Sequence, residues 1–278
     1  MIEKEEGINT PIQWQNTAAW EKLRHIDLAR ESQIPLPCSN TSAAKQMRLA
    51  FILAVLAREI NKYIFQPTYI APTDGNILRR VLNDQAAKDS EKESFCRLIL
   101  LSIDPATQAR TCFENVQLVV QNVSACLNEL LSEDQRHTFH KSLSNVVQKA
   151  SEVWKPIQCS RRRYEPDFDP PLADDEWMSF VVPSSEKTTA ANDASKKNPY
   201  CHAISVFPRL SVIENDTITE YTAITQLTSS NNLWVTADRE MVQEPPSPTI
   251  ARGGLLRRTI ANPRGLSISS GGSKKGGG

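Results

Sequence analysis

The chain has 278 residues, 40% of them hydrophobic and 6% aromatic, which is enough for one or two domains. A formal net charge of +0 excludes a uniform field that would draw the whole molecule onto nucleic acid or an anionic membrane. The first residues lack the basic and apolar regions of a signal peptide, and the six cysteines form no C-x-x-C pair. The longest apolar run, Leu49 to Ala57, is far shorter than the roughly 20 residues of a membrane span, so we expect a soluble intracellular protein without membrane contact.

The first two predicted helices follow a short N-terminal segment, residues 1–12, that we expect to be disordered. The first helix runs from about Gln13 to Glu31 and ends before Pro35, because proline restricts the residue that precedes it. The second opens at the capping candidates Ser39 to Thr41. It is apolar on nearly all sides between Leu49 and Leu56, which is typical of a central helix buried on several sides.

Three further helical regions are predicted before residue 159. Residues 76–103 contain a capping box, Ser90 to Glu93, ahead of an apolar run that starts at Phe95. The next helix begins with Asp104 as N-cap and Pro105 as its first residue. The last begins at the capping box Ser132 to Gln135 and carries apolar residues at steps of three and four. The sequence therefore predicts an all-α fold, a bundle of about five helices over residues 13–158, followed by a largely disordered tail.

Residues 159–183 form an acidic segment with large apolar residues. Seven acids and no base lie between Tyr164 and Glu186. Trp177, Phe180 and Val181 are spaced so that one helical turn would place all three on one side, and they are our candidate interaction residues. Three interpretations stay open: docking on the chain's own bundle, which the aromatic residues favour, a motif for a partner's groove, or disorder.

Residues 184–278 are predicted to be mostly disordered, with short strands possible at 203–213 and 217–227, where apolar and β-branched residues recur. Six bases and no acid lie between Pro245 and Gly278. Within this tail Ser247, Thr259 and Ser267 match the short patterns that proline-directed and basophilic kinases read, and they are our candidate phosphorylation sites. The same bases could hold a nucleic-acid backbone, in a weak and salt-sensitive way.

No signature of catalysis or cofactor binding is present in the sequence. Phosphate-binding glycine loops, the H-E-x-x-H zinc motif and the G-x-S-x-G nucleophile motif are all missing. His137 and His140 could share a helix face, but no cysteine or acid accompanies them at metal-ligand spacing. We therefore expect no catalytic residues, no metal site and no cofactor.

Three segments carry a family resemblance: Trp14 to Ala29, Leu49 to Ile60, and Tyr63 to Tyr69. They resemble a family of uncharacterised filamentous-fungal proteins, over roughly residues 8–182. Some members of that family are labelled as meiotic recombination accessory proteins. The resemblance implies a unitary helical module and brings no catalytic residues.

These observations lead to a ranked expectation of function. The first is a non-enzymatic interaction or scaffold protein with a regulatory tail and a protein partner whose identity the sequence does not indicate. The second is an accessory factor in DNA transactions of the meiotic recombination type, which the family label and the basic tail suggest. The third is an enzyme whose site is assembled from dispersed residues.

Overall fold

The structure is a computed structural model that describes residues 17–70, 75–169, 177–182 and 202–244. The chain divides into two compact units, Met1–Gln243 and Glu244–Gly278, and the fold given below is that of the first. Its helices are α1 (Thr17–Arg24), α2 (Asp27–Glu31), α3 (Ser42–Tyr63), α4 (Gly75–Lys88), α5 (Ser90–Ser102), α6 (Pro105–Leu127), α7 (Glu133–Gln158) and α8 (Asn232–Val242). Its strands are β1 (Arg163–Asp167), β2 (Trp177–Ser179), β3 (Ala203–Phe207), β4 (Arg209–Glu214), β5 (Thr217–Thr222) and β6 (Ile224–Thr228).

The prediction of an all-α fold is wrong, because two three-stranded sheets accompany the helices. One sheet has the order β1-β4-β5 and is antiparallel; the other has the order β2-β6-β3, with β2 parallel to β6. The stretches 203–213 and 217–227 each contain two of these strands. A hairpin alone is marginal in water, but β3 packs against α3, and this burial stabilises the strands. A largely disordered tail is therefore also wrong for residues 202–244.

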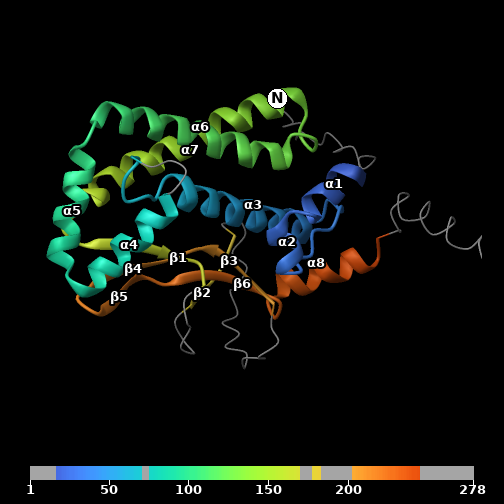
Figure 1. The fold of residues 1–278 in the computed structure, drawn as a ribbon. Helices are drawn as coiled ribbons and strands as arrows, with labels where there is room; N and C mark the ends of the chain where they lie inside the picture. The colour runs from blue at the N-terminus through green and yellow to red at the C-terminus, as the bar shows by residue number, and fades with distance from the viewer. Residues whose placement is uncertain (1–16, 71–74, 170–176, 183–201, 245–278) are drawn as a thin grey trace, which may run out of the picture. The chain divides into compact units, whose positions relative to one another are not determined.

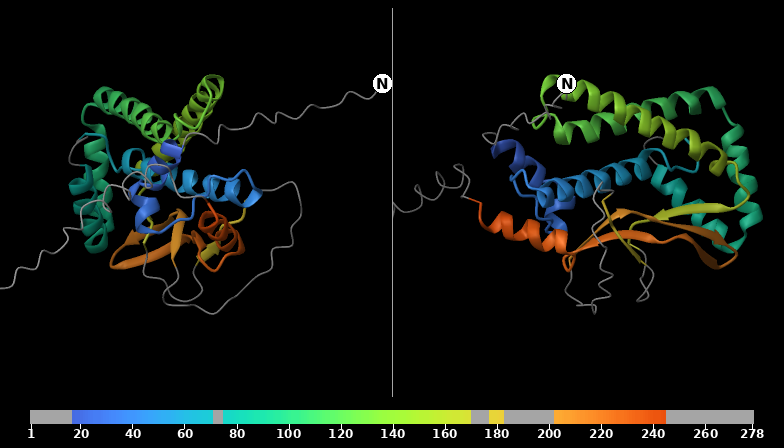
Figure 2. Two further views of the ribbon diagram at one scale, coloured as in Figure 1. Left: turned by 90° about the vertical axis from the view of Figure 1, so that its right-hand side faces the viewer. Right: turned by 180° about the vertical axis from the view of Figure 1, so that it is seen from behind.

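Helix α3 is the centre of the described fold, as its apolar sequence predicted. It contacts α6, α8 and β3, and Figures 1 and 2 show it between the α6–α7 pair and the strands. Its first half packs Met47 and Phe51 into one core cluster with residues of β3, β6 and α8. Its second half places Ile60 and Ile64 in another cluster, with α6 and α7. Among the described residues, no helix combines the length and apolar character that crossing a membrane requires.

Three of the predicted helix starts are confirmed and one is wrong. Thr41 caps α3 by accepting the backbone N–H of Ala44 at 3.1 Å. Asp104 caps α6 by accepting the backbone N–H of Thr107 at 3.0 Å, with Pro105 as the first helical residue. Ser132 opens α7 in a capping box with Gln135. The box predicted at Ser90 to Glu93 does not form, because Asp89 is the N-cap of α5 and accepts from the N–H of Lys92 at 2.9 Å. The side chain of Glu93 takes no part in a cap and instead forms an ion pair with Arg97.

A tight turn between β4 and β5 fixes the corner at which α4 meets α5. Asn215 and Asp216 have φ values of 47° and 61°, the left-handed conformation that a two-residue hairpin turn of this twist requires. Their N–H groups donate to the carbonyls of Ala86 and Ala87, at 3.1 and 2.5 Å, and so satisfy the end of α4. The side-chain oxygen of Asn215 accepts from the N–H of Ser90 at 3.1 Å, at the start of α5. The turn therefore caps both helices.

A buried tyrosine predicts how stability depends on alkaline pH. Tyr69 donates its hydroxyl to the carbonyl of Ile64 at 2.6 Å, and burial raises the pKa of this hydroxyl. In the unfolded chain it ionises near pH 10, while in the fold it keeps its proton. The stabilisation from this group is therefore complete below about pH 10 and is lost as the pH rises further.

We expect Tyr69→Phe to flatten the fall in unfolding free energy above about pH 10, by up to about 1.4 kcal/mol per pH unit. Urea denaturation of both proteins at about pH 8, 10 and 11 measures the two slopes. Equal slopes in the variant and the wild type would contradict this role for Tyr69.

Candidate interaction surface

Helix α5 is oriented opposite to an ordinary amphipathic helix. Its buried residues are polar: Ser90, Glu93 and Arg97, with Glu93 at 0% and Arg97 at 1% exposure. After its first turn, its exposed large residues are apolar: Phe95 is 66% exposed, Leu98 41% and Ile99 45%. Ile103, directly after the helix, is exposed as well. A helix on a protein surface normally buries its apolar side, so this orientation requires a specific cause. We call Phe95, Leu98, Ile99 and Ile103 the α5 apolar face.

A buried ion pair holds the polar side of α5 inward. Arg97 donates from Nε and Nη2 to the two carboxylate oxygens of Glu93, at 2.8 and 3.0 Å. Its remaining donors reach two backbone carbonyls, those of Gln158 and Ser160, the latter at 2.8 Å. These carbonyls belong to the end of α7 and the residues after it, where helical carbonyls lack partners and positive charge is favourable. Arg97 therefore fastens α5 to the end of α7.

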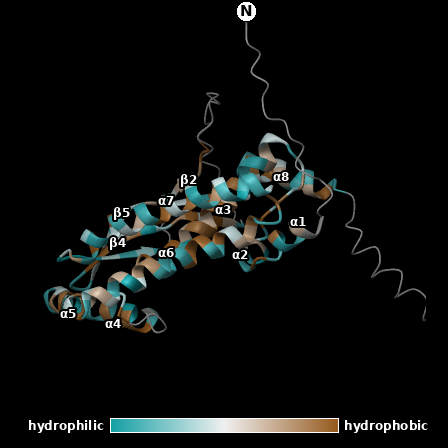
Figure 3. Ribbon diagram, turned by 90° about the horizontal axis from the view of Figure 1, so that it is seen from above, coloured by the Kyte–Doolittle hydropathy of each residue, from teal (hydrophilic) through white to brown (hydrophobic). Residues whose placement is uncertain are grey.

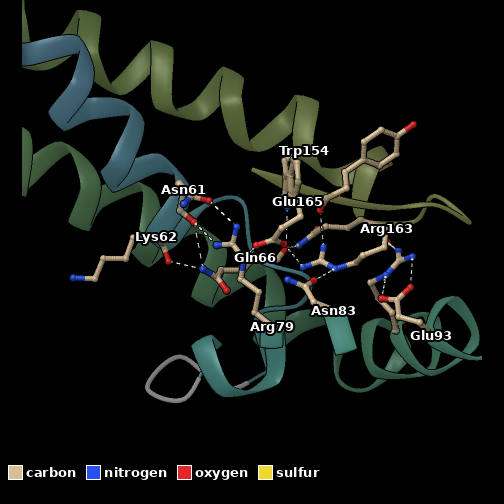
Figure 4. A network of polar contacts seen from close by, with 12 residues as sticks. Asn61, Lys62, Gln66, Arg79, Asn83, Glu93, Trp154, Arg163 and Glu165 are labelled. Carbon is tan, nitrogen blue, oxygen red and sulfur yellow. Dashed lines mark hydrogen bonds and ion pairs between the residues drawn. The ribbon is translucent and has the colours of Figure 1, made fainter. Parts of the chain in front are cut away.

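The same kind of contact joins β1 to α4. Arg163 donates to the side-chain oxygen of Asn83 and to Glu165, both at 2.8 Å, and Arg79 donates to the other oxygen of Glu165 at 2.6 Å. Arg79 also reaches the backbone and side-chain oxygens of Asn61, at the end of α3. Figure 4 shows these arginines converging between the helices and β1. Burial lowers the pKa of Arg163 to about 10, and the charge of Glu165 opposes that shift.

The two carboxylates of this network are held by arginines on both of their oxygens. Both oxygens of Glu93 accept from Arg97, and the two oxygens of Glu165 accept from Arg79 and Arg163. Such charge-assisted pairs fix the positions of the helices and the strand that carry them. Over the described ranges, no group of three or more histidine, cysteine, aspartate or glutamate side chains is placed to hold a metal ion.

In its first turns, helix α4 also buries a charged side chain and exposes apolar ones. Arg79 is buried in the network, whereas Ile77 and Val81, which lie on the other side of the helix, are exposed. Figure 3 shows apolar residues along the ribbons of both α4 and α5. At this end of the fold, the buried arginines Arg79 and Arg97 thus accompany exposed apolar side chains on both helices.

The structure separates the three residues predicted to form one interaction side. Phe180 is buried at 7% exposure in the core cluster around α3, and its N–H donates to Gln226 in β6 at 2.8 Å. Val181 is exposed at 66%, and Trp177 is half-buried in β2. The cause is that the segment is not helical: Trp177 lies in strand β2, so spacing at i, i+3 and i+4 does not bring the three side chains to one side. Of the three open interpretations, docking on the chain's own core describes Phe180.

Replacing Phe180 tests this assignment. We expect Phe180→Ala to lower the free energy of unfolding by about 3 kcal/mol, because it leaves a cavity in the core. Val181→Ala, at the next and exposed position, is the matched control and should change it by less than about 0.5 kcal/mol. Urea denaturation followed by circular dichroism measures both, and equal effects would contradict a core role for Phe180.

Other predicted features lie outside the described residues. These are the N-terminal segment 1–12, three of the six acids of the 159–183 segment (Asp174, Asp175 and Glu176), the candidate phosphorylation sites Ser247, Thr259 and Ser267, and the basic residues of 245–278. The DNA-transaction hypothesis depends on those basic residues and stays a prediction.

Comparison with protein-family models, with curated proteins and with solved structures finds no match. The resemblance to the filamentous-fungal family therefore stays a prediction as well.

The α5 apolar face was not predicted from the sequence, in which Phe95, Leu98 and Ile99 belong to a predicted helix and Glu93 to its predicted capping box. The available signal was the spacing of Ser90, Glu93 and Arg97, a polar stripe at steps of three and four with opposite charges four apart. Such a stripe is buried only when its charges are paired, as they are here.

Proposed function

We propose that this chain is a non-enzymatic intracellular interaction or scaffold protein, and that its docking element is the α5 apolar face. The observation that carries the proposal is that Phe95, Leu98 and Ile99 are exposed on a helix that buries the charged side chains of Glu93 and Arg97. Covering one such side chain fully contributes about 1.5–3 kcal/mol. A few apolar anchors of this kind supply most of the affinity of a typical protein interface.

The spacing of these residues indicates what binds them. Phe95, Leu98 and Ile99 stand at i, i+3 and i+4, the arrangement by which one helix packs along another. The exposed charges of α5, Glu91 and Lys92, stand four and three residues before Phe95 and so lie on the same side of the helix, one turn earlier. We therefore propose a partner helix with its own apolar stripe and with polar residues where it passes Glu91 and Lys92.

Site-specific photo-cross-linking tests the proposal. The full chain is expressed with p-benzoylphenylalanine in place of Phe95, and cross-linked peptides are sequenced. The matched control is the same replacement of Phe113 on α6, an exposed phenylalanine whose helical neighbours Arg110, Glu114 and Gln117 are polar.

We expect a specific adduct from position 95, mapping to an apolar helical stripe, and none from position 113. A second substitution, Leu98→Glu, should reduce the adduct at least tenfold. No adduct, or equal adducts from both positions, would contradict the proposed function.

A further inference from the structure

We infer that α4 and α5 form one arm, which opens from the rest of the fold as a unit while the two core clusters stay packed. The inference goes beyond the proposed function and does not depend on it. Figures 1 and 3 show the two helices together at one end of the fold. Each of them packs more extensively against the other than against any further described element. Helices that are contiguous in sequence and packed on each other in this way form a cooperative opening unit. We call them the α4–α5 arm.

Apolar packing contributes less to holding this arm than to holding the other helices. Among the described residues, neither core cluster contains a side chain from α4 or α5. The buried side chains of α5 are those of Ser90, Glu93 and Arg97, and the buried apolar side chains of α4 are those of Leu82 and Ala86. Burial of apolar surface is the dominant favourable contribution to folding. An element that has little of it opens at a lower free energy than the core.

Polar contacts join the arm to its neighbours. Arg97 reaches two carbonyls at the end of α7, and the turn between β4 and β5 caps the junction of α4 and α5. From α6, the side-chain amide of Gln108 donates at 3.0, 3.0 and 2.8 Å to the carbonyls of Leu100, Leu101 and Ile103. Water replaces bonds of this kind when the arm opens, so each of them contributes only a small net stabilisation.

The buried charges keep partners on both sides when the arm opens. Glu93 and Arg97 are both on α5, so their ion pair leaves with the arm. Arg163 and Glu165 are both on β1, so their ion pair stays behind. The bonds from Arg79 to α3 and β1 break, and its guanidinium then enters water. Opening therefore leaves no charge of these two pairs buried alone, which would be the largest cost of dividing such a network.

The chain leaves the arm between α5 and α6, at Ile103 and Asp104. Ile103 is extended, and Asp104 has a φ of 45°, so the helical backbone is interrupted there. Hinges are commonly a few residues of this kind at the ends of elements. Because the arm carries the α5 apolar face, a ligand on that face shifts the opening equilibrium only if it binds the open or the closed state more tightly.

Hydrogen exchange of the full chain, followed by mass spectrometry at urea concentrations below the main unfolding transition, tests the inference. After correction for intrinsic rates, we expect the amides of α4 and α5 to exchange through one common opening. It should be at least about tenfold faster than exchange of the slowest amides of α3 and α7. Its urea dependence should be smaller than that of global unfolding, because less surface becomes exposed. Equal protection in α3 and in the arm, or separate openings for α4 and α5, would overturn the inference.

A core variant separates opening of the arm from unfolding of the whole fold. Val147 is buried in the second core cluster, and its contacts persist when the arm is open. Val147→Ala should therefore speed exchange of the slowest amides of α3 and α7 about tenfold or more, and leave exchange in α4 and α5 within about twofold. Circular dichroism checks that the variant folds. An equal acceleration in α3 and in the arm would mean that the arm opens only with the core, and would overturn the inference.

A variant of the arm itself tests what holds it closed. Arg97→Met leaves Glu93 buried without its partner in the closed state, and should speed exchange in α4 and α5 at least about a hundredfold. Arg80→Met, at an exposed position of α4, is the matched control and should leave this exchange within about twofold. Unchanged exchange in the arm of the Arg97→Met protein would contradict a polar attachment of the arm.

Discussion

Replacing Arg97 by methionine is expected to lower the free energy of unfolding by about 3–5 kcal/mol, among the largest effects of any single change in this fold. The reason is that Glu93, at 0% exposure, would keep its charge in the interior without a partner. The carbonyls of Gln158 and Ser160 would lose their donors as well. Urea denaturation followed by circular dichroism measures the change.

Two further variants sharpen the Arg97 result. Glu93→Gln combined with Arg97→Met removes both charges, and we expect it to recover part of the loss, because no ion is then buried alone. Arg80→Met, an exposed arginine on the neighbouring helix α4, is the matched control and should change stability by less than about 0.5 kcal/mol. An Arg97→Met protein within 1 kcal/mol of wild type, on the order of a surface substitution, would show that the ion pair does not hold α5.

The second large effect is expected from Trp154 on α7. This side chain is 2% exposed, lies 4.6 Å from the ring of Phe65 between ring centroids, and donates to the carbonyl of Gln66 at 2.9 Å. Truncating a buried tryptophan leaves a large cavity, so Trp154→Ala should lower the unfolding free energy by about 3–5 kcal/mol. Thermal and urea denaturation followed by far-ultraviolet circular dichroism measure the loss.

The neighbouring residue supplies the control for Trp154. Val153→Ala changes an exposed side chain on the same helical turn and should have an effect below about 0.5 kcal/mol. Trp154→Phe keeps most of the volume but removes the donor to Gln66, and should lose about 1–3 kcal/mol. If alanine and phenylalanine at position 154 gave the same loss, the cavity would not be the main cause.

The helices could be predicted from the sequence where their signals are local. Asp104 and Pro105 mark the start of α6, and Ser132 with Gln135 marks the start of α7, because a cap involves residues only three apart. The same reasoning failed at Ser90 to Glu93. There the pattern of a capping box was present, but Glu93 has a stronger partner in Arg97, and that pairing depends on burial by α7 and the residues after it.

Beyond the short strands predicted at 203–213 and 217–227, the two sheets could not be predicted, because pairings such as β1 with β4 and β2 with β6 join distant parts of the chain. Strand β1 begins at Arg163 and pairs with β4, which begins at Arg209, and each has only five or six residues. Pro166 in β1 also weakened the strand pattern of that segment. In β5 every residue is exposed, so its sequence shows no buried side. Alternation between a buried and an exposed side is the usual signal of a strand.

The candidate surface was the least predictable part. Phe95, Leu98 and Ile99 look in the sequence like the buried side of an ordinary helix. Which side of α5 faces inward is decided by Arg97 and its carbonyl partners after residue 157, and by the turn at Asn215. These contacts lie 61 to 125 residues away along the chain.

The turn at Asn215 and Asp216 has a consequence for the order of assembly during synthesis. The acceptor of the Ser90 amide, the side-chain oxygen of Asn215, is synthesised 125 residues later. At a ribosomal rate of about 5–20 residues per second, that interval is roughly 6–25 seconds. Until it has passed, the amide of Ser90 and the carbonyls of Ala86 and Ala87 lack these partners, although Asp89 already caps α5. The α4–α5 corner is therefore completed late, and a nascent chain stalled before residue 215 should expose it to proteolysis while the α6–α7 pair is already formed.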